Sequence, residues 1–303
     1  MAFQENSAVA DIGQIYALLK VFLLGIGWTL DGEVSSSSAP VLSMHKDSAF
    51  FTISGGITVT AALAYGSGVF NHVDGNNWGG SFTTVWFFAD PDKNYFHVVA
   101  TKGVGDYYHF SFGQVDSVGM TGNSYYATAQ QWDMSSPINL TARPSNVPAF
   151  VSQAAFVIPN GVLNPSFAGS GDLATNVSKK TLDVHRFAGD STVFPYDGEE
   201  FPTFKILDYV ADMQNTNTTG GVHLHSIPLI AVLNTYDHNL GIAPDVRLCS
   251  ITNLSDAQEV INSGDTWKVF PVMKRGFRSS LYAGISPVAS LNSVNLGFAY
   301  KKT

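Results

Sequence analysis

Two runs of alternating residues that flank a glycine-rich turn constrain the fold of this chain more than any other feature. Residues 107–113 alternate between two sets of side chains, Tyr108, Phe110 and Phe112 in one set and Tyr107, His109 and Ser111 in the other. Successive side chains of a β-strand point to opposite faces, so this pattern predicts a half-buried strand. Residues 95–100 form a second run, and residues 101–106 between them contain two glycines. The sequence therefore predicts a β-hairpin.

Patterns typical of strands continue through much of the chain. Residues 82–88 form a nearly continuous aromatic and β-branched run, which indicates a strand buried on both faces. In the second half, strands are expected at residues 182–187, 204–209, 223–234, 246–251, 267–272 and 296–301, with a brief helix candidate at residues 256–261. The sequence contains no repeat of fixed period, which disfavours a solenoid or a propeller. The predicted fold is all-β, antiparallel and sandwich-like.

One amphipathic helix is expected near the N-terminus. Apolar residues recur with helical spacing over residues 12–23, while Gln14 and Lys20 lie off the apolar side. Ser7 is the expected N-cap, and Gly25 is expected to end the helix. The spacing does not decide whether the apolar side packs on its own chain or on a neighbour.

Four segments are expected along the chain. They are residues 1–28 with the N-terminal helix, residues 29–138 as a β-rich subdomain, residues 139–180 as a connector, and residues 181–303 as a second β-rich subdomain. A polar loop is expected at residues 31–40. Five prolines between positions 137 and 165 indicate the connector, because proline donates no hydrogen bond to a sheet and favours edges and turns.

The chain is poor in charge. Charged residues make up 13% of the sequence and hydrophobic residues 45%, whereas roughly 25% charged residues is ordinary for a soluble domain. A surface with so little charge repels similar surfaces weakly, which suits packing against neighbours. The net charge is −8, with 16 basic and 24 acidic residues. Direct binding to nucleic acid is not expected, because phosphates need a concentrated basic face.

Neither membrane insertion nor export is expected. The most apolar stretch, residues 15–28, is interrupted by Lys20 and is shorter than the ~20 residues of a membrane span. Glu5 and Asp11 stand where a signal peptide carries basic residues. Cys249 is the single cysteine, and its apolar neighbours predict a buried, inert thiol.

No catalytic residues and no cofactor are predicted. No window of the sequence matches the Gly-x-Ser-x-Gly nucleophile elbow. The acids in residues 197–200 could support glycoside hydrolysis, but neighbouring positions on an extended chain point to opposite faces, and their composition favours a surface turn. Gly103 and Gly105 lie in a hairpin turn, whereas a phosphate loop opens a helix.

Histidines provide a weak candidate for a metal site. His223 and His225 are two residues apart and would share one face of a strand. A metal would still need a third and a fourth ligand, so polar strand or interface histidines are the preferred interpretation. His97 and His109 would face each other across the hairpin in one possible register, as a polar cross-strand pair.

Three parts of the chain carry a resemblance to known proteins. They are YALLKVFLLGIGW (residues 16–28) with MHKDSAFF (44–51), YFHVVATKGVGDYYHFSFG (95–113), and WKVFP (267–271) with GFAYKK (297–302). In these parts the chain resembles an uncharacterised class of virion structural proteins encoded by tailed bacteriophages. The resemblance implies a tail, collar or baseplate component in symmetric copies, and it supplies no catalytic residues.

The expected partners are therefore other virion proteins and copies of the chain itself. The expected location is the virion, after synthesis in the cytoplasm of the bacterial host. The N-terminal helix, the hairpin tip at Gly103 and the loop at residues 275–292 are the predicted contact elements, since long polar loops often carry binding surfaces.

Two other functions remain as alternatives. The first is a receptor- or glycan-binding module of a tail fibre, in which aromatic residues such as Trp78 and Trp132 would stack on a sugar. The second is a depolymerising enzyme that uses Glu199 or Glu200 as an acid.

Overall fold

The computed structural model describes residues 1–56, 58–62, 68–73, 78–103, 106–114, 116, 125–129, 154–157, 222–233, 236–271 and 296–303. In this part of the chain the elements are, in order, β1 (Ala2–Val9), α1 (Ile12–Leu24), β2 (Thr29–Val34), β3 (Val41–Lys46), β4 (Ala49–Ser54), β5 (Thr58–Ala62), β6 (Gly68–Val73), β7 (Phe82–Ala89), β8 (Tyr95–Gly103), β9 (Asp106–Gln114), β10 (Tyr125–Ala129), β11 (Ala154–Val157), β12 (His225–Leu233), β13 (Tyr236–Ser250), β14 (Gln258–Asn262), β15 (Asp265–Pro271) and β16 (Leu296–Lys301).

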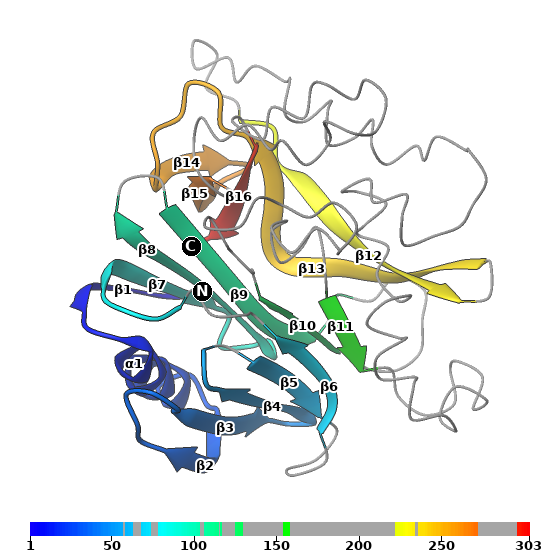
Figure 1. Ribbon diagram of the computed structural model, residues 1–303. Coiled ribbons are helices and arrows are strands. Elements are labelled where there is room, and N and C mark those ends of the chain that lie inside the picture. The colour runs from blue at the N-terminus through cyan, green and yellow to red at the C-terminus, as the bar shows by residue number, and fades with distance from the viewer. Residues whose placement is uncertain are drawn as a thin grey trace, which may run out of the picture.

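The strands form three antiparallel sheets (Figure 1). Their strand orders are β1-β7-β8-β9-β10-β11 in sheet A, β2-β3-β4-β5-β6 in sheet B, and β12-β13-β16-β15-β14 in sheet C. In Figure 1, sheet B and the blue helix α1 lie below sheet A, and sheet C lies above it. The predicted all-β, antiparallel, sandwich-like fold is confirmed, with sheet A as a central layer.

Sheet B and α1 cover one face of sheet A. The ring of Phe51 in β4 lies 4.9 Å from that of Phe96 in β8. Trp28, which follows α1, packs edge-on against both rings, at 5.4 and 6.0 Å. Phe22 of α1 lies 5.5 Å from Phe87 of β7. The helix therefore packs its apolar side on its own chain, which the spacing of its residues alone did not decide.

Sheet C covers the opposite face of sheet A. Trp86 of β7 lies 4.9 Å from Phe270 of β15, and Phe88 lies 5.2 Å from Tyr300 of β16 in a stacked arrangement. All four of these rings are buried. Because neighbouring positions of β7 point to the two covered faces, the strand is apolar at almost every position. Burial of residues 82–88 on both faces is thereby confirmed.

The predicted hairpin is confirmed as β8 and β9, and its turn is shorter than expected because Gly103 already pairs with Asp106. The expectation that its return strand is half-buried is wrong. Tyr107, His109 and Ser111 are as well covered as the aromatic set between them. Sheet C supplies this cover from residues far along the chain, and no local pattern could reveal it.

The N-terminal boundary of the helix differs from the prediction. Asp11 is the N-cap, and its side chain accepts a hydrogen bond of 2.8 Å from the Gln14 backbone N–H. Ser7 lies instead in β1, opposite Thr84 of β7. β1 was not predicted, because its partner strand supplies the hydrogen bonds that make it a strand.

Two further segments differ from the sequence prediction. Residues 29–34 form β2 where a polar loop was expected to begin, and residues 258–262 form β14 where a brief helix was expected. Strands near residues 223–234, 246–251, 267–272 and 296–301 are confirmed by β12, β13, β15 and β16. Residues 182–187 and 204–209 lie outside the described residues, as does the expected connector at residues 139–180 apart from β11.

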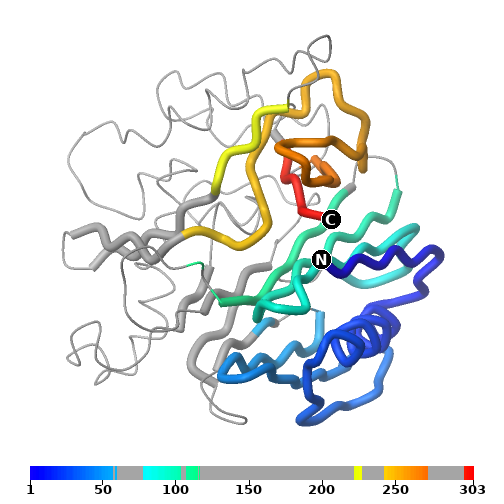
Figure 2. The backbone as a smooth tube through the Cα atoms, turned by 180° about the vertical axis from the view of Figure 1, so that it is seen from behind, coloured from blue at the N-terminus to red at the C-terminus, as the bar shows by residue number. Residues whose placement is uncertain are grey.

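One hydrophobic core joins the beginning, middle and end of the described chain. It includes Ile15 of α1, Phe51 of β4, Phe96 of β8, Val246 of β13 and Tyr300 of β16. The two ends of the chain also meet, because the Lys302 ammonium lies 4.8 Å from the centre of the Phe3 ring. Figure 2 shows from behind that the N-terminus and the C-terminus lie near each other.

Candidate functional site

The helix α1 has one buried and one exposed side. The buried side contains Ile12, Ile15, Tyr16, Leu19, Phe22 and Leu23. The exposed side contains Gln14, Ala17, Val21 and Leu24. These exposed positions are spaced by three, four and three residues, so they form one stripe along the helix.

Large hydrophobic side chains that face solvent gather in one part of the described chain. Val21 and Leu24 of α1 are 63% and 46% exposed, and Leu30 and Val34 of β2 are 37% and 54% exposed. Among the described residues, one other large hydrophobic side chain is exposed, Ile261 of β14. A concentration of exposed apolar side chains is typical of a surface that binds another protein.

The strand β2 lies at the edge of sheet B. It pairs with β3 on one side, and no strand in the described ranges pairs with its other side. Asp31 is the extra residue of a bulge in β2, and its carboxylate lies 2.8 Å from Nδ1 of His45. An edge strand presents backbone N–H and C=O groups that another strand can use.

An ion pair connects the helix to this edge strand. Lys20 of α1 lies 2.6 Å from Glu33 of β2. Exposed apolar residues lie on both elements that this ion pair connects. We call them the α1–β2 surface, which consists of Ala17, Val21, Leu24, Leu30 and Val34.

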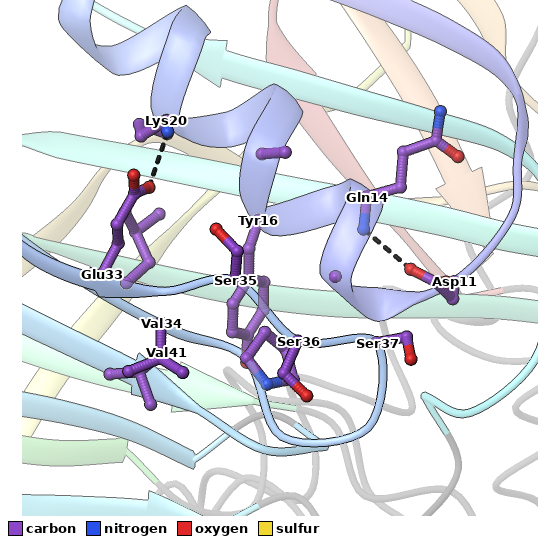
Figure 3. Close-up of a pocket in the computed structure, with 14 residues that line it drawn as sticks. Asp11, Gln14, Tyr16, Lys20, Glu33, Val34, Ser35, Ser36, Ser37 and Val41 are labelled. Carbon is purple, nitrogen blue, oxygen red and sulfur yellow. Dashed lines mark hydrogen bonds and ion pairs between the residues drawn. The ribbon is translucent and has the colours of Figure 1, made fainter.

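A pocket of about 360 Å³ lies between α1 and the segment that follows β2 (Figure 3). Lys20 and Glu33 lie at one end, and Asp11 with Gln14 lies at the other. Its lining also contains the hydroxyls of Ser35, Ser36 and Ser37. Both carboxylates of the lining are engaged, Asp11 by a backbone N–H and Glu33 by a lysine, so the pocket offers polar contacts rather than a free acid pair.

The two hairpin histidines are fully buried between sheets A and C. Nε2 of His97 lies 2.8 Å from the Pro244 carbonyl, and Nδ1 lies 2.8 Å from the Ser111 hydroxyl. A carbonyl can only accept, so Nε2 carries the proton and Nδ1 accepts from the serine. Burial lowers the pKa of His97 to about 4. This histidine is therefore neutral at pH 7.

His109 has the same arrangement one strand away. Its Nε2 donates to the Pro271 carbonyl at 3.1 Å, and its Nδ1 accepts from the Tyr300 hydroxyl at 2.8 Å. Burial lowers the pKa of His109 to about 3. Each histidine thus joins sheet A to a prolyl carbonyl of sheet C. The prediction that the two histidines face each other is wrong, because His97 pairs with Ser111 and His109 with Val99.

A charged cluster lies beside these histidines. Asp245 of β13 accepts a hydrogen bond of 2.7 Å from the Tyr95 hydroxyl and lies 3.1 Å from the Lys93 ammonium. Burial alone would raise the pKa of Asp245, but the Tyr95 hydrogen bond and the Lys93 charge outweigh it and lower that pKa. Asp116 also pairs with Lys93, at 3.4 Å. The cluster ties the turn before β8 to sheet C.

The metal candidates do not gain further ligands within the described residues. His223 is exposed, and His225 is partly buried at the start of β12, where its Nε2 has no hydrogen-bond partner among the described residues. Burial, together with the neighbouring His223, lowers the pKa of His225. In the described part of the chain, no three His, Cys, Asp or Glu side chains come together where they could hold a metal ion.

The other predicted positions divide into two groups. Trp78 is fully buried, and its ring packs 5.3 Å from those of Tyr108 and Phe110, so it cannot stack on a sugar. Cys249 is buried as predicted, and burial raises the pKa of its thiol to about 12. Trp132, the acids at residues 197–200 and the loop at residues 275–292 lie outside the described residues.

No protein-family model matches the sequence, and no curated protein matches it. The helix in the described part of the chain lacks the length and apolar character that crossing a membrane requires.

Proposed function

We propose that this chain is a non-enzymatic structural subunit of a tailed-phage particle, in which it binds copies of itself and other virion proteins in the tail, collar or baseplate. The observation that carries the proposal is the α1–β2 surface, where exposed apolar side chains lie beside a sheet edge that none of the described strands pairs with. Both features are typical of protein contact surfaces. The virion, after synthesis in the bacterial cytoplasm, is the proposed location.

The resemblance to phage virion proteins that the sequence suggests is the second reason for the proposal, and the residues that carry it lie together in the fold. Residues 16–28 and 44–51, the hairpin, and the C-terminal strands all contribute to one core. Trp28 packs on Phe51 and Phe96, and His109 binds Tyr300. The resemblance therefore falls on residues that build the fold together.

Mass spectrometry of purified particles from a phage that carries this gene tests the proposal. We expect the chain in a constant ratio to the other structural proteins, and we expect a bound antibody to mark one region of the particle in electron micrographs. A chain found in the infected cell but absent from washed particles would contradict the proposal.

A receptor- or glycan-binding module is the second candidate, and the hydroxyl-lined pocket beside α1 is the observation that favours it. Because Trp78 is buried, replacing it would damage the core and would not test sugar binding. A glycan array with the Gln14→Ala and Ser37→Ala variants is the better test, since both side chains line the pocket. Binding that vanishes in both folded variants would favour this candidate over the structural one.

A further inference from the structure

We infer that a second copy of this chain docks on the α1–β2 surface, so that two copies meet about a two-fold axis through the same residues. This inference rests on the proposed structural role and names the partner of that surface. In a two-fold contact, the same surface of each copy faces that of the other copy, so the surface must be complementary to itself.

The charges of the surface fit a copy of itself better than a charged partner. Residues 12–41 contain three side chains that are charged at neutral pH, Lys20, Asp31 and Glu33. Lys20 pairs with Glu33, and Asp31 binds His45. The whole chain has a net charge of −8, and a contact through a segment with so few charged side chains adds little repulsion between two copies. Through the α1–β2 surface, Lys20 of each copy can also approach Glu33 of the other.

The open edge of sheet B fits a copy as well. Two identical edge strands that meet about a two-fold axis run antiparallel, which is the pairing that satisfies their free backbone groups on both sides at once. Residues 32–34 of β2, beyond the bulge at Asp31, offer such an edge, since no described strand pairs with their other side, and Leu30 and Val34 add exposed apolar area next to it.

The stripe on α1 has the spacing and the sizes that an antiparallel helix pair needs. Ala17, Val21 and Leu24 follow a spacing of four and three residues, as along the seam of two packed helices. A two-fold axis near Val21 places the small Ala17 of one copy opposite the larger Leu24 of the other. Small side chains opposite large ones pack without voids.

Sedimentation of the purified full chain over a range of concentrations provides the first test. We expect a dimer, and we expect Val21→Asp and Leu24→Asp each to raise its dissociation constant by roughly tenfold or more, because each buries a charge in an apolar contact. Ile261→Asp is the matched control, since Ile261 is an apolar residue at another sheet edge and is at least as exposed, at 70%. Circular dichroism and a melting curve confirm that each variant is folded.

Cross-linking provides the second test, because a two-fold axis brings each residue close to its own copy. Val21→Cys should oxidise to a disulfide-linked dimer, whereas Ser255→Cys, exposed between β13 and β14, should not. Cys249 does not interfere, because it is fully buried.

Three results would overturn the inference. They are a monomer at every concentration, a dimer that tolerates Val21→Asp and Leu24→Asp, and a Val21→Cys thiol that no maleimide can label because the chain itself covers it. Failure of the proposed function is distinguishable, because it is the absence of the chain from purified particles. A monomer that is nevertheless present in particles overturns the dimer inference and leaves the structural role standing.

Discussion

His109 of β9 and Tyr300 of β16 lie 191 residues apart in the sequence, yet Nδ1 of the histidine accepts a hydrogen bond of 2.8 Å from the tyrosine hydroxyl, and their rings stack 5.8 Å apart. Both side chains are fully buried. Together with His97, this pair joins the central sheet to sheet C through polar groups in an otherwise apolar layer. All of these groups are satisfied while the histidines are neutral.

Acid should therefore destabilise the protein in a defined pH range. Below the ordinary histidine pKa of 6.5, the unfolded chain binds protons at positions 97 and 109, but the folded chain does not until the pH falls to about 4 and about 3. The stability that the neutral histidines contribute is thus complete above pH 6.5 and is lost as the pH falls toward these values. From pH 6.5 to about 4.5 we expect a loss of roughly 5 kcal/mol for the two histidines together.

Urea denaturation at several pH values measures this loss. His109→Gln should reduce the slope of stability against pH by about one proton. Ser255→Ala should leave the slope unchanged, because it removes an exposed side chain that does not titrate. Equal slopes in the wild type and in His109→Gln would contradict the prediction.

The Tyr95 hydroxyl should contribute more stability than the Lys93 ammonium. Tyr95→Phe removes a hydrogen bond to a largely buried carboxylate, and we expect a loss of about 1–3 kcal/mol. The Lys93 side chain is 38% exposed, so Lys93→Met should cost less than about 1 kcal/mol. Chemical denaturation at neutral pH checks both values, and a larger effect for the lysine variant would show that the ion pair dominates.

Gly297 of β16 should not tolerate a side chain. A methyl group there would collide with the Ile251 side chain and lie 2.8 Å from the Phe270 carbonyl oxygen. We expect Gly297→Ala to destabilise the protein by about 1–3 kcal/mol, as overpacking of a core does. Gly79→Ala is the control, since nothing lies within 4 Å of its added methyl group. Thermal melting curves of the two variants should differ clearly, and matching curves would refute the predicted collision.

The two sides of α1 should respond differently to truncation. Leu19→Ala should cost about 2–5 kcal/mol, because Leu19 is fully buried in the core. Val21→Ala should change the stability of the monomer by less than about 0.5 kcal/mol, because Val21 faces solvent.

Deletion of residues 1–27 would remove both β1 and the helix from the core, so we expect an unfolded or aggregated chain rather than a soluble β domain. A truncated chain with a cooperative melting transition would show that α1 is dispensable for folding.

Strands whose pattern is local could be predicted from the sequence. The alternation of residues 107–113 and the continuous run at residues 82–88 each identify a strand without reference to the rest of the chain. The polar partners could not be predicted in the same way. His97 binds the Pro244 carbonyl 147 residues away, and His109 binds the Pro271 carbonyl 162 residues away. Every residue presents a backbone carbonyl, so no residue type in the sequence identifies these acceptors.

The α1–β2 surface is a second feature that could not be predicted from the sequence alone. The sequence indicated an amphipathic helix and named it as a contact element, but it assigned β2 to a polar loop. An edge strand is defined by the partner it has and the one it lacks, which is a property of the sheet and not of residues 29–34 alone.

The amino-acid sequence by itself determined that this chain forms antiparallel strands around aromatic side chains, with one amphipathic helix, because the periods of two and of 3.6 residues follow from the geometry of each element. Only the tertiary structure decided that sheet A is covered on both sides, that His97 and His109 are neutral, and which side of α1 remains open to solvent. Burial depends on segments that meet in space after long separations along the chain. The local spacing of residues contains no information about these long-range contacts.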